Sequence, residues 1–459
     1  MKRFLERLTA LFWNRFAYRK RLVRLGTGLI LGTRVIEEVV TTSKVVVAHE
    51  RRAMHISLLG RTGTGKSSLL RWFCEQDIEA GQGAFVLDIH GELTPALLSA
   101  IAARERKGKD DLSDRLIVID PVDPEFSVGI NPLEGTQGQG RFVRVLQFAE
   151  VLKHRWGLHA FGARTDELLR NALYVLAENG LTLLELSPLL ADPLFRISCL
   201  RNVTNADVRQ YFELRFNNAS EAMQGVMREP ILNKTSAFTA DEHFRGIIGQ
   251  RRSTFSITQA MDEGRWVLLS IPKGTLGGEA ITLGALFLTS VKHACYERSR
   301  RNLFTIYADE LQNFVGYGAD LETMLAEVRK FGVSVCTANQ FLEQLPQEMR
   351  AAMLAIGTHI FFQLSPPDAQ FVAGALDGGK SLAERLKNLP FRHLIAKSGS
   401  DPLVEVAVPD LRVPNALWQD LYERSRRRWA RPRKEIEAEI VTRQANIRRS
   451  GREVLDGWE

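Results

Sequence analysis

The sequence has few cysteines and no long apolar run, and both absences exclude classes of protein. Its 459 residues include four cysteines, Cys74, Cys199, Cys295 and Cys336, which lie far apart and form no C-x-x-C pair. Such a set argues against a disulfide framework or a zinc site and fits the reducing cytoplasm. A membrane-spanning helix needs roughly 20 apolar residues, and the longest apolar runs here are about half that. We therefore expect no transmembrane span, and we find no pattern of a secretory signal.

Positive charge is concentrated at the two ends of the chain. The formal net charge is +7. Residues 1–25 carry eight lysines and arginines against one acid, and residues 424–459 carry eleven against six. The body between them is therefore slightly negative. Contact with nucleic acid in the body would have to come from local basic patches and not from an overall positive field.

Each basic end allows more than one interpretation. Apolar residues at helical spacing predict a basic amphipathic helix over residues 1–25. This helix could dock on the protein's own body, lie in the plane of a membrane surface, or contact a partner or nucleic acid. The membrane interpretation would make the chain peripheral at the inner face of the cell membrane. For the Arg-rich C-terminal tail, 422–459, we expect a helix and a mobile segment that contacts DNA or a partner or is solvated.

The order of apolar segments predicts an α/β fold. Strand patterns alternate with helix patterns in residues 26–140 and again in 263–421, which is typical of a parallel sheet with crossover helices. Between them, residues 141–262 have only helical periodicity. We therefore expect a central, mostly parallel sheet flanked by helices, built from the two outer segments and interrupted by an all-helical insert.

A glycine-rich stretch, GRTGTGKS, fits the phosphate-binding pattern G-x-x-x-x-G-K-[ST]. An apolar strand precedes it and a helix follows it, as phosphate binding requires. The N–H groups of the loop and the positive end of the helix would hold phosphate oxygens. Lys66 would bridge the β- and γ-phosphates of ATP, and the Ser67 hydroxyl would ligate Mg²⁺. The expected nucleotide-binding residues are Gly60, Arg61, Thr62, Gly63, Thr64, Gly65, Lys66, Ser67 and Ser68.

Two carboxylates end the apolar segment LFTIYADE. Placing them at the end of a buried strand is costly unless they have a function. We expect Asp309 to hold Mg²⁺, directly or through water, and Glu310 to orient and activate the attacking water. The alternative is an acidic pair on the surface, and Asp88 and Asp120 are weaker candidates for the acidic role. A glutamate next to the metal-binding aspartate favours transfer of the phosphate to water over transfer to another substrate. The sequence also has no N-K-x-D guanine-recognition motif, which argues against a switch GTPase.

Two further residues could complete the site. Gln340 ends the segment VSVCTANQ, which we expect to lie next to the strand before the glycine-rich loop. There its side chain could sense the γ-phosphate, although a strand-end amide without a role is the alternative. Arg329 ends a predicted helix and could be a finger that enters a neighbouring subunit's site, which would require an oligomer. The alternative is a solvated helix cation.

Several segments, in this order, together resemble the conjugative coupling-protein family (TraD/TraG type, type IV secretion) of the FtsK–HerA group. They are the glycine-rich loop, VLDIHGEL, FGARTDELLRNAL, LLSIPKGTLGGEAITLGALFL, YADELQNFV, LAEVRKFGVSVCTANQFLEQLP and THIFFQLSPPDAQFVAGAL, and they cover roughly residues 50–410. The resemblance implies a RecA-like motor domain, a helical insert facing DNA and relaxosome proteins, and a ring of six subunits. It implies the roles given above for Lys66, Asp309, Glu310, Arg329 and Gln340.

These observations predict an ATP-hydrolysing DNA translocase that uses ATP and Mg²⁺. It would pump DNA, single-stranded in our expectation, through a hexameric ring toward a type IV secretion machinery. Relaxosome or secretion-channel proteins would be its partners. Three alternatives stay open: a type IV secretion or pilus-assembly ATPase acting on protein, a HerA-like helicase or translocase in DNA repair or phage defence, and an ATP-gated membrane adaptor without motor activity.

Overall fold

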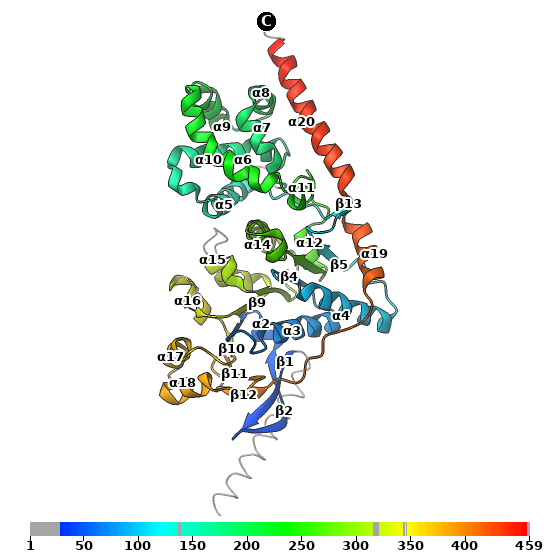
Figure 1. Ribbon diagram of the computed structural model, residues 1–459, viewed down its shortest axis with the longest axis vertical. Coiled ribbons are helices and arrows are strands. Elements are labelled where there is room, and N and C mark those ends of the chain that lie inside the picture. Colours follow the sequence, from blue (N-terminus) through cyan, green and yellow to red (C-terminus); the bar gives the residue numbers. More distant parts are fainter. Residues whose placement is uncertain (1–27, 136–138, 315–320, 343–344, 346, 457–459) are drawn as a thin grey trace, which may run out of the picture. The chain divides into compact units, whose positions relative to one another are not determined.

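The computed structural model describes residues 28–135, 139–314, 321–342, 345 and 347–456 (Figure 1). The predicted helix at 1–25 lies outside these residues. The chain forms two compact units. Unit 1 contains the described residues up to Gln82, together with Leu303–Gln312 and Leu325–Pro414. Unit 2 contains Gly83–Asn302, the described part of Asn313–Met324, and the chain from Asn415 onward.

Unit 1 is built on a sheet with the strand order β2-β1-β12-β11-β10-β3-β9-β8. Its strands β10, β3, β9 and β8 are parallel to one another. The strands β11, β12, β1 and β2 continue the sheet in antiparallel pairs. The bounds are β1 Gly28–Ile36, β2 Val39–Ala48, β3 Ile56–Leu59, β8 Phe304–Asp309, β9 Val333–Asn339, β10 Thr358–Phe361, β11 His393–Ser398 and β12 Val404–Ala407.

The parallel strands of unit 1 are buried along their whole length, as their continuous apolar sequences predict. Helices α3 and α17 contribute further buried apolar side chains. Strands β11 and β12, which follow each other in the chain, form an antiparallel hairpin. The helices are α2 His49–Arg52, α3 Lys66–Ala80, η5 Val328–Phe331, α16 Gln347–Leu354, α17 Pro366–Ala375 and α18 Gly379–Lys387.

Unit 2 combines a small parallel sheet with many helices. Its sheet has the order β4-β7-β5, with β4 Ala84–Asp88, β7 Trp266–Ser270 and β5 Leu116–Ile119. Helices α4 Leu93–Gly108, α13 Lys273–Leu276 and α14 Glu279–Glu297 belong to the same unit. The α/β class expected from the sequence, with parallel strands flanked by helices, is therefore confirmed.

The stretch for which we expected a helical insert contains only helices and their connections among its described residues. Asp192 begins α8 by accepting hydrogen bonds from the N–H groups of Leu194 and Phe195, and Pro193 occupies the first turn. The helices are α5 Gln139–Arg155, η1 Leu158–Phe161, α6 Ala163–Glu178, η2 Leu183–Glu185, α7 Leu186–Ala191, α8 Pro193–Leu200, α9 Ala206–Gln210, η3 Tyr211–Phe216, α10 Glu221–Thr239, α11 Glu242–Ile248 and α12 Ile257–Asp262.

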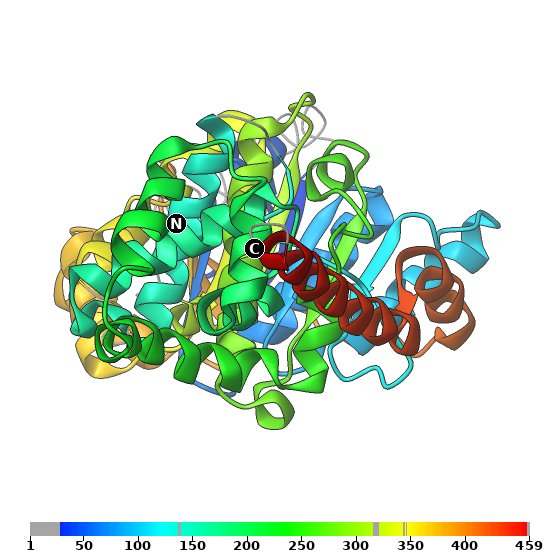
Figure 2. The ribbon, with the colours of Figure 1, turned by 90° about the horizontal axis from the view of Figure 1, so that it is seen from above.

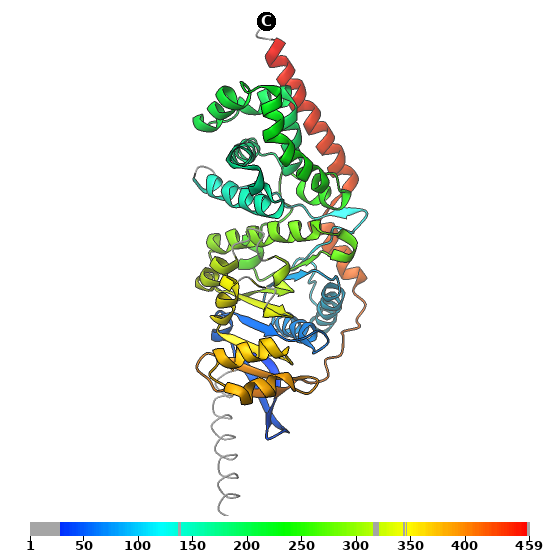
Figure 3. The ribbon, with the colours of Figure 1, turned by 60° about the vertical axis from the view of Figure 1, so that its left-hand side comes forward.

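The described part of the tail, 422–456, is mostly helical, and the expected mobile segment stays a prediction. Helix α19, Gln419–Trp429, packs against β5 and α4 (Figure 2), and strand β13, Arg431–Pro432, pairs with β6, Phe126–Ser127. Helix α20, Arg433–Asp456, then lies along α8 and α11 (Figure 3). Ile436 and Ile440 are buried, which explains why this Arg-rich segment packs within unit 2. Across the part of the chain that the structure covers, no helix is both long and apolar enough to cross a membrane.

Close packing of α20 against α8 depends on Gly451. A Cβ atom at this position would lie 1.9 Å from the carbonyl oxygen of Leu194, a backbone atom. We expect Gly451→Ala to destabilise unit 2 by about 1–3 kcal/mol, because overpacking forces the two helices apart. Protease cleavage within α20 and the thermal midpoint would measure the change. Ser450→Ala, at the exposed neighbouring position, is the control. Equal resistance of the two variants would contradict this account.

Candidate nucleotide-binding site

The glycine-rich loop connects β3 to α3 in unit 1, and its glycines are required by its geometry. Gly63 and Gly65 have φ angles of 78° and 107°, which side-chain-bearing residues rarely adopt. A Cβ atom on Gly60 would lie 2.6 Å from the Cβ atom of Phe362. Helix α3 begins at Lys66. The loop therefore has the backbone of a phosphate-binding site at a helix N-terminus.

Lys66 is buried and lies across its own loop. Its Nζ donates a hydrogen bond to the carbonyl oxygen of Arg61 at 2.9 Å. Burial lowers the pKa of Lys66, while the charges of Asp309 and Glu310 oppose this decrease. The ammonium group is therefore held between the loop and two acidic residues, where an anionic phosphate would replace a backbone carbonyl as its partner.

Ser67 and Asp309 meet in the structure. The Oγ of Ser67 donates a hydrogen bond to Oδ2 of Asp309 at 2.8 Å, and Asp309 is buried at the end of β8. A hydroxyl and a carboxylate supply hard oxygen ligands, which Mg²⁺ prefers. The two residues expected from the sequence to hold Mg²⁺ therefore fit that ion in both chemistry and proximity.

Glu310 is held by a chain of side-chain contacts. Gln340 donates from Nε2 to Oε1 of Glu310, and Gln340 Oε1 accepts from the hydroxyl of Thr62 at 3.1 Å. Glu310 also has a φ of 53°, a strained conformation for a residue with a side chain. Strain at a single position of this kind is typical of functional sites. The contacts join the glycine-rich loop to the carboxylate through Gln340.

Strand order brings these residues together. Strand β9 lies between β3 and β8, with Leu59 opposite Asn339 and Asp309 opposite Ala338. The expectation that the strand ending in Gln340 adjoins the strand before the loop is confirmed. Asn339, which the sequence analysis did not single out, is buried and donates from Nδ2 to Oε1 of Gln312 at 2.7 Å. Three parallel strands thus end at one edge, where all these side chains meet.

Arg329 is not part of this cluster within one chain. It lies on η5, which precedes β9, and it is exposed. Among the residues that the structure describes, no hydrogen bond or ion pair joins its side chain to the glycine-rich loop. This placement is compatible with a finger for a neighbouring subunit and equally with a solvated cation, so the role of Arg329 remains a prediction.

His55 holds the segment that precedes Arg329. Its Nδ1 accepts from the N–H of Val335 at 2.9 Å, and its Nε2 lies 2.7 Å from the carbonyl oxygen of Leu325. Both bonds form only if His55 is neutral with its proton on Nε2. Its φ of 69° is strained and its side chain is buried. Sequence reasoning missed His55 because a histidine before a strand carries no motif.

The stability of unit 1 should depend on the neutral state of His55. Burial lowers the pKa of His55 to about 4, and the charge of Arg329 contributes to this decrease. Below the ordinary pKa of 6.5, His55 binds a proton in the unfolded chain, whereas in the folded chain it stays neutral until the pH approaches about 4. The stabilisation is therefore complete above about pH 6.5 and is lost as the pH falls to about 4, a change of roughly 3 kcal/mol.

Denaturant unfolding at a series of pH values would measure this effect. His55→Asn removes the titrating group and keeps a residue that tolerates positive φ. We expect the unfolding free energy of this variant to fall less steeply between pH 6.5 and 4 than that of the unmodified chain. Identical slopes would show that His55 is not the group responsible.

A buried ion pair fixes α3 to β8. Arg52 donates to Oδ1 of Asp77 at 2.7 Å, and the hydroxyl of Tyr307 donates to Oδ2 of the same carboxylate at 2.6 Å. Asp77 is on α3 and Tyr307 is on β8. The helix that starts at the glycine-rich loop and the strand that ends in Asp309 therefore share one anchor. No local sequence pattern indicates this pairing, because its members lie far apart along the chain.

The two weaker acidic candidates have local structural roles in unit 2. Asp88 is buried and accepts hydrogen bonds from the N–H groups of Gly91 and Thr94, both at 2.8 Å, and from the hydroxyl of Thr94. Asp120 accepts from the N–H of Val122 at 2.9 Å. These bonds shape the turn before α4 and the turn after β5. They supply a structural reason for each carboxylate.

Comparisons with known proteins agree with this geometry. Residues 38–136 match a family model described as the central domain of the helicase HerA. The bacterial conjugative coupling protein TrwBdeltaN70, in an unbound form, aligns over 84% of this chain and 92% of its own, with 16% identity and a TM-score of 0.57. TrwB in complex with ADP and Mg²⁺ aligns over 85% and 96%, with 18% identity and a TM-score of 0.55.

A second kind of protein is equally similar. VirB4 of Thermoanaerobacter pseudethanolicus aligns over 86% of this chain and 99% of its own, with 14% identity and a TM-score of 0.56. No curated protein matches the sequence. At these identities the likeness concerns the fold, and it confirms the fold that the motifs implied. The chain has the RecA-like P-loop ATPase fold shared by TrwB and VirB4.

Proposed function

We propose that the chain is an ATP-hydrolysing DNA translocase of the conjugative coupling-protein type. The observation that carries this proposal is the cluster formed where β3, β9 and β8 end, in which Ser67 contacts Asp309 and Gln340 contacts Glu310. The cluster has the groups that ATP hydrolysis needs. The match of residues 38–136 to a helicase domain and the fold shared with a conjugative coupling protein support DNA as the cargo.

The residues act in the following way in this proposal. The loop N–H groups and Lys66 bind the β- and γ-phosphates of ATP, and Ser67 and Asp309 hold Mg²⁺, which neutralises phosphate charge when bound. Glu310 takes a proton from the attacking water. Before ATP binds, Gln340 holds Glu310 by a hydrogen bond. In this proposal the oxygens of an arriving γ-phosphate compete with Glu310 for the Gln340 amide, which frees Glu310 to contact water.

Oligomerisation completes the proposed site. Arg329 is exposed on η5, which is a different element from the glycine-rich loop of its own chain. In a ring of six subunits it would reach the ATP bound by the neighbouring subunit and stabilise the charge of the transition state. Hydrolysis would then change the contact between subunits and move DNA-binding loops along the phosphate backbone.

A protein-secretion ATPase is the second candidate, and the equal likeness to VirB4 favours it. The two candidates differ in what stimulates hydrolysis. Contacts with the DNA backbone release counterions, so DNA stimulation should weaken steeply with salt. We expect single-stranded DNA to accelerate hydrolysis. The DNA concentration for half-maximal stimulation should rise about tenfold or more between about 50 and 200 mM salt. A rate that ignores DNA and responds only to a secretion protein would favour the second candidate.

A further inference from the structure

We propose that a cavity in unit 2 binds a small hydroxylated organic anion, one that carries a phosphate or carboxylate group and no aromatic ring. The cavity lies between α20 and the ends of α6 and α8 and has a volume of about 600 Å³. Sites for small ligands commonly have about 300–1,000 Å³. Its lining mixes charged, polar and apolar side chains, and the charged ones are Arg251, Glu439 and Arg443.

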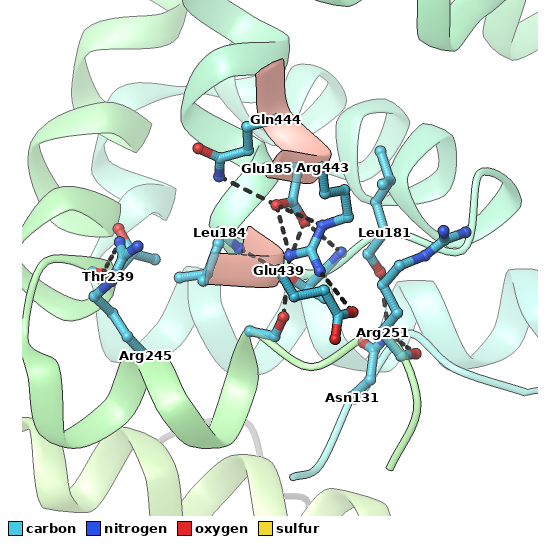
Figure 4. Close-up of polar contacts among 12 residues, drawn as sticks. Asn131, Leu181, Leu184, Glu185, Thr239, Arg245, Arg251, Glu439, Arg443 and Gln444 are labelled. Atoms are coloured by element: carbon cyan, nitrogen blue, oxygen red, sulfur yellow. Dashed lines mark hydrogen bonds and ion pairs between the residues drawn. The ribbon is translucent and has the colours of Figure 1, made fainter. Parts of the chain in front are cut away.

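Arg443 supplies the first anion-binding group (Figure 4). Its Nε and Nη2 donate to Oε1 of Glu185 at 3.2 and 2.9 Å, and Nη2 also donates to the carbonyl oxygen of Gly249 at 3.0 Å. Arg443 is 8% exposed, and its Nη1 makes no hydrogen bond to any described residue but only a long ion pair, at 3.7 Å, with Oε1 of Glu439. An unsatisfied buried donor costs about 1–3 kcal/mol. An oxygen acceptor in the cavity would remove that cost.

Arg251, which also lines the cavity, supplies the second group. Its Nε donates to the carbonyl oxygen of Gly180 at 2.8 Å, and its Nη2 donates to that of Asn179 at 3.3 Å. The buried side chain of Asn131 donates to the carbonyl oxygens of Arg251 and Leu181 at 2.9 and 3.1 Å (Figure 4). Both the backbone and the guanidinium plane of Arg251 are therefore fixed before any ligand binds, which lowers the entropy cost of binding.

The charges around the cavity favour an anion. Glu439 lines the cavity and would repel an anion, but its Oε1 lies 3.7 Å from Nη1 of Arg443 and its Oε2 lies 3.0 Å from Nη2 of Arg431. The charged side chains that line the cavity are therefore two arginines, Arg251 and Arg443, and one carboxylate, Glu439. One formal positive charge remains. Guanidinium groups bind carboxylate and phosphate oxygens through charge-assisted hydrogen bonds.

The other lining residues define the class of ligand. Five of the twelve lining residues carry amides or hydroxyls: Asn179, Ser198, Asn202, Thr442 and Asn446. The amide of Asn179 is already bonded to two carbonyl oxygens and to Asn202. Amides and hydroxyls suit a ligand that carries several hydroxyls beside its anionic group. Among the described residues, none that lines the cavity is aromatic, and stacking on aromatic rings is the usual means of holding nucleobases. A phosphorylated or carboxylated polyol therefore fits the cavity better than a nucleotide or a nucleic-acid strand.

Thermal unfolding of the full chain tests the proposal with glucose 6-phosphate and citrate as probes. The measurement uses the Lys66→Ala variant, because the glycine-rich loop would itself bind anions. We expect a saturable rise of the thermal midpoint with at least one probe, relative to sodium chloride at equal ionic strength. A midpoint that does not change with either probe would overturn the proposal and leave a cavity filled by water.

Variants locate the binding. Arg251→Gln should weaken binding of the active probe at least tenfold. Arg448→Gln should not, because Arg448, which lies on α20 like Arg443, is exposed, pairs with Asp192 and does not line the cavity. If Arg251→Gln fails to fold, Thr442→Phe takes its place as the cavity variant. Thr442 is exposed, and the added ring would fill the cavity and weaken binding of the probe. Unchanged binding in the cavity variant, or equal weakening by Arg448→Gln, would overturn the proposal.

Discussion

Replacement of Glu310 by glutamine is expected to slow ATP hydrolysis by about 10²–10⁴, because the amide cannot accept a proton from water. ATP binding should be retained, since the glycine-rich loop, Lys66 and Ser67 are unchanged. The contact between Gln340 and position 310 can still form through the amide oxygen. Steady-state hydrolysis and binding of a fluorescent ATP analogue, measured on the same preparation, would separate the two effects.

Glu384→Gln is the matched control for this prediction. Glu384 is exposed on α18 of the same unit, where it pairs with Lys387. We expect this variant to hydrolyse ATP at the rate of the unmodified chain. A Glu310→Gln variant that also turns over at that rate would show that another group activates the water, and the assignment of Glu310 would be wrong.

Replacement of Arg329 by alanine is expected to reduce hydrolysis by about 10³ or more if this residue is a finger for the neighbouring subunit. Lys330→Ala changes the adjacent exposed cation and should have a much smaller effect. Because Arg329 is exposed, the folded state should be unaffected, and equal thermal midpoints would verify this. Near-normal hydrolysis by Arg329→Ala would leave a solvated helix cation as the better interpretation.

Mixing two inactive variants tests whether Arg329 acts on a neighbour. In a mixed oligomer, an Arg329→Ala subunit retains Glu310 and can receive Arg329 from an adjacent Glu310→Gln subunit. Hydrolysis should therefore reappear on mixing, in proportion to the fraction of such interfaces. If Arg329 acts within its own chain, every site in the mixture lacks one of the two groups and the activity stays absent.

Much of the fold could be predicted because its strands are buried on both faces. The segments that became β3, β8 and β9 are continuous apolar runs that end in polar residues. The candidate site follows from the same property, since parallel strands place their ends at one edge of the sheet. Ser67, Asp309, Glu310 and Gln340 therefore come together although they are far apart along the chain.

Other features depend on contacts that no local pattern records. The bonds of His55 to Leu325 and Val335 join residues 270 and 280 positions apart, and histidine has no preference that would reveal them. No sequence pattern predicts how helix α20 packs, because arginines and glutamates outnumber its apolar residues. Its packing rests on tertiary contacts: two buried isoleucines, the ion pair of Arg443 with Glu185, and the close approach at Gly451.

The most direct test of the central claim combines two measurements on the full chain: the rate of ATP hydrolysis as a function of single-stranded DNA, and the mass of the particle with and without ATP analogue. A DNA-translocating ring requires hydrolysis that rises with DNA and a mass of about six chains when nucleotide or DNA is bound. A particle that stays a monomer under all conditions and hydrolyses ATP at a rate independent of DNA would contradict the account.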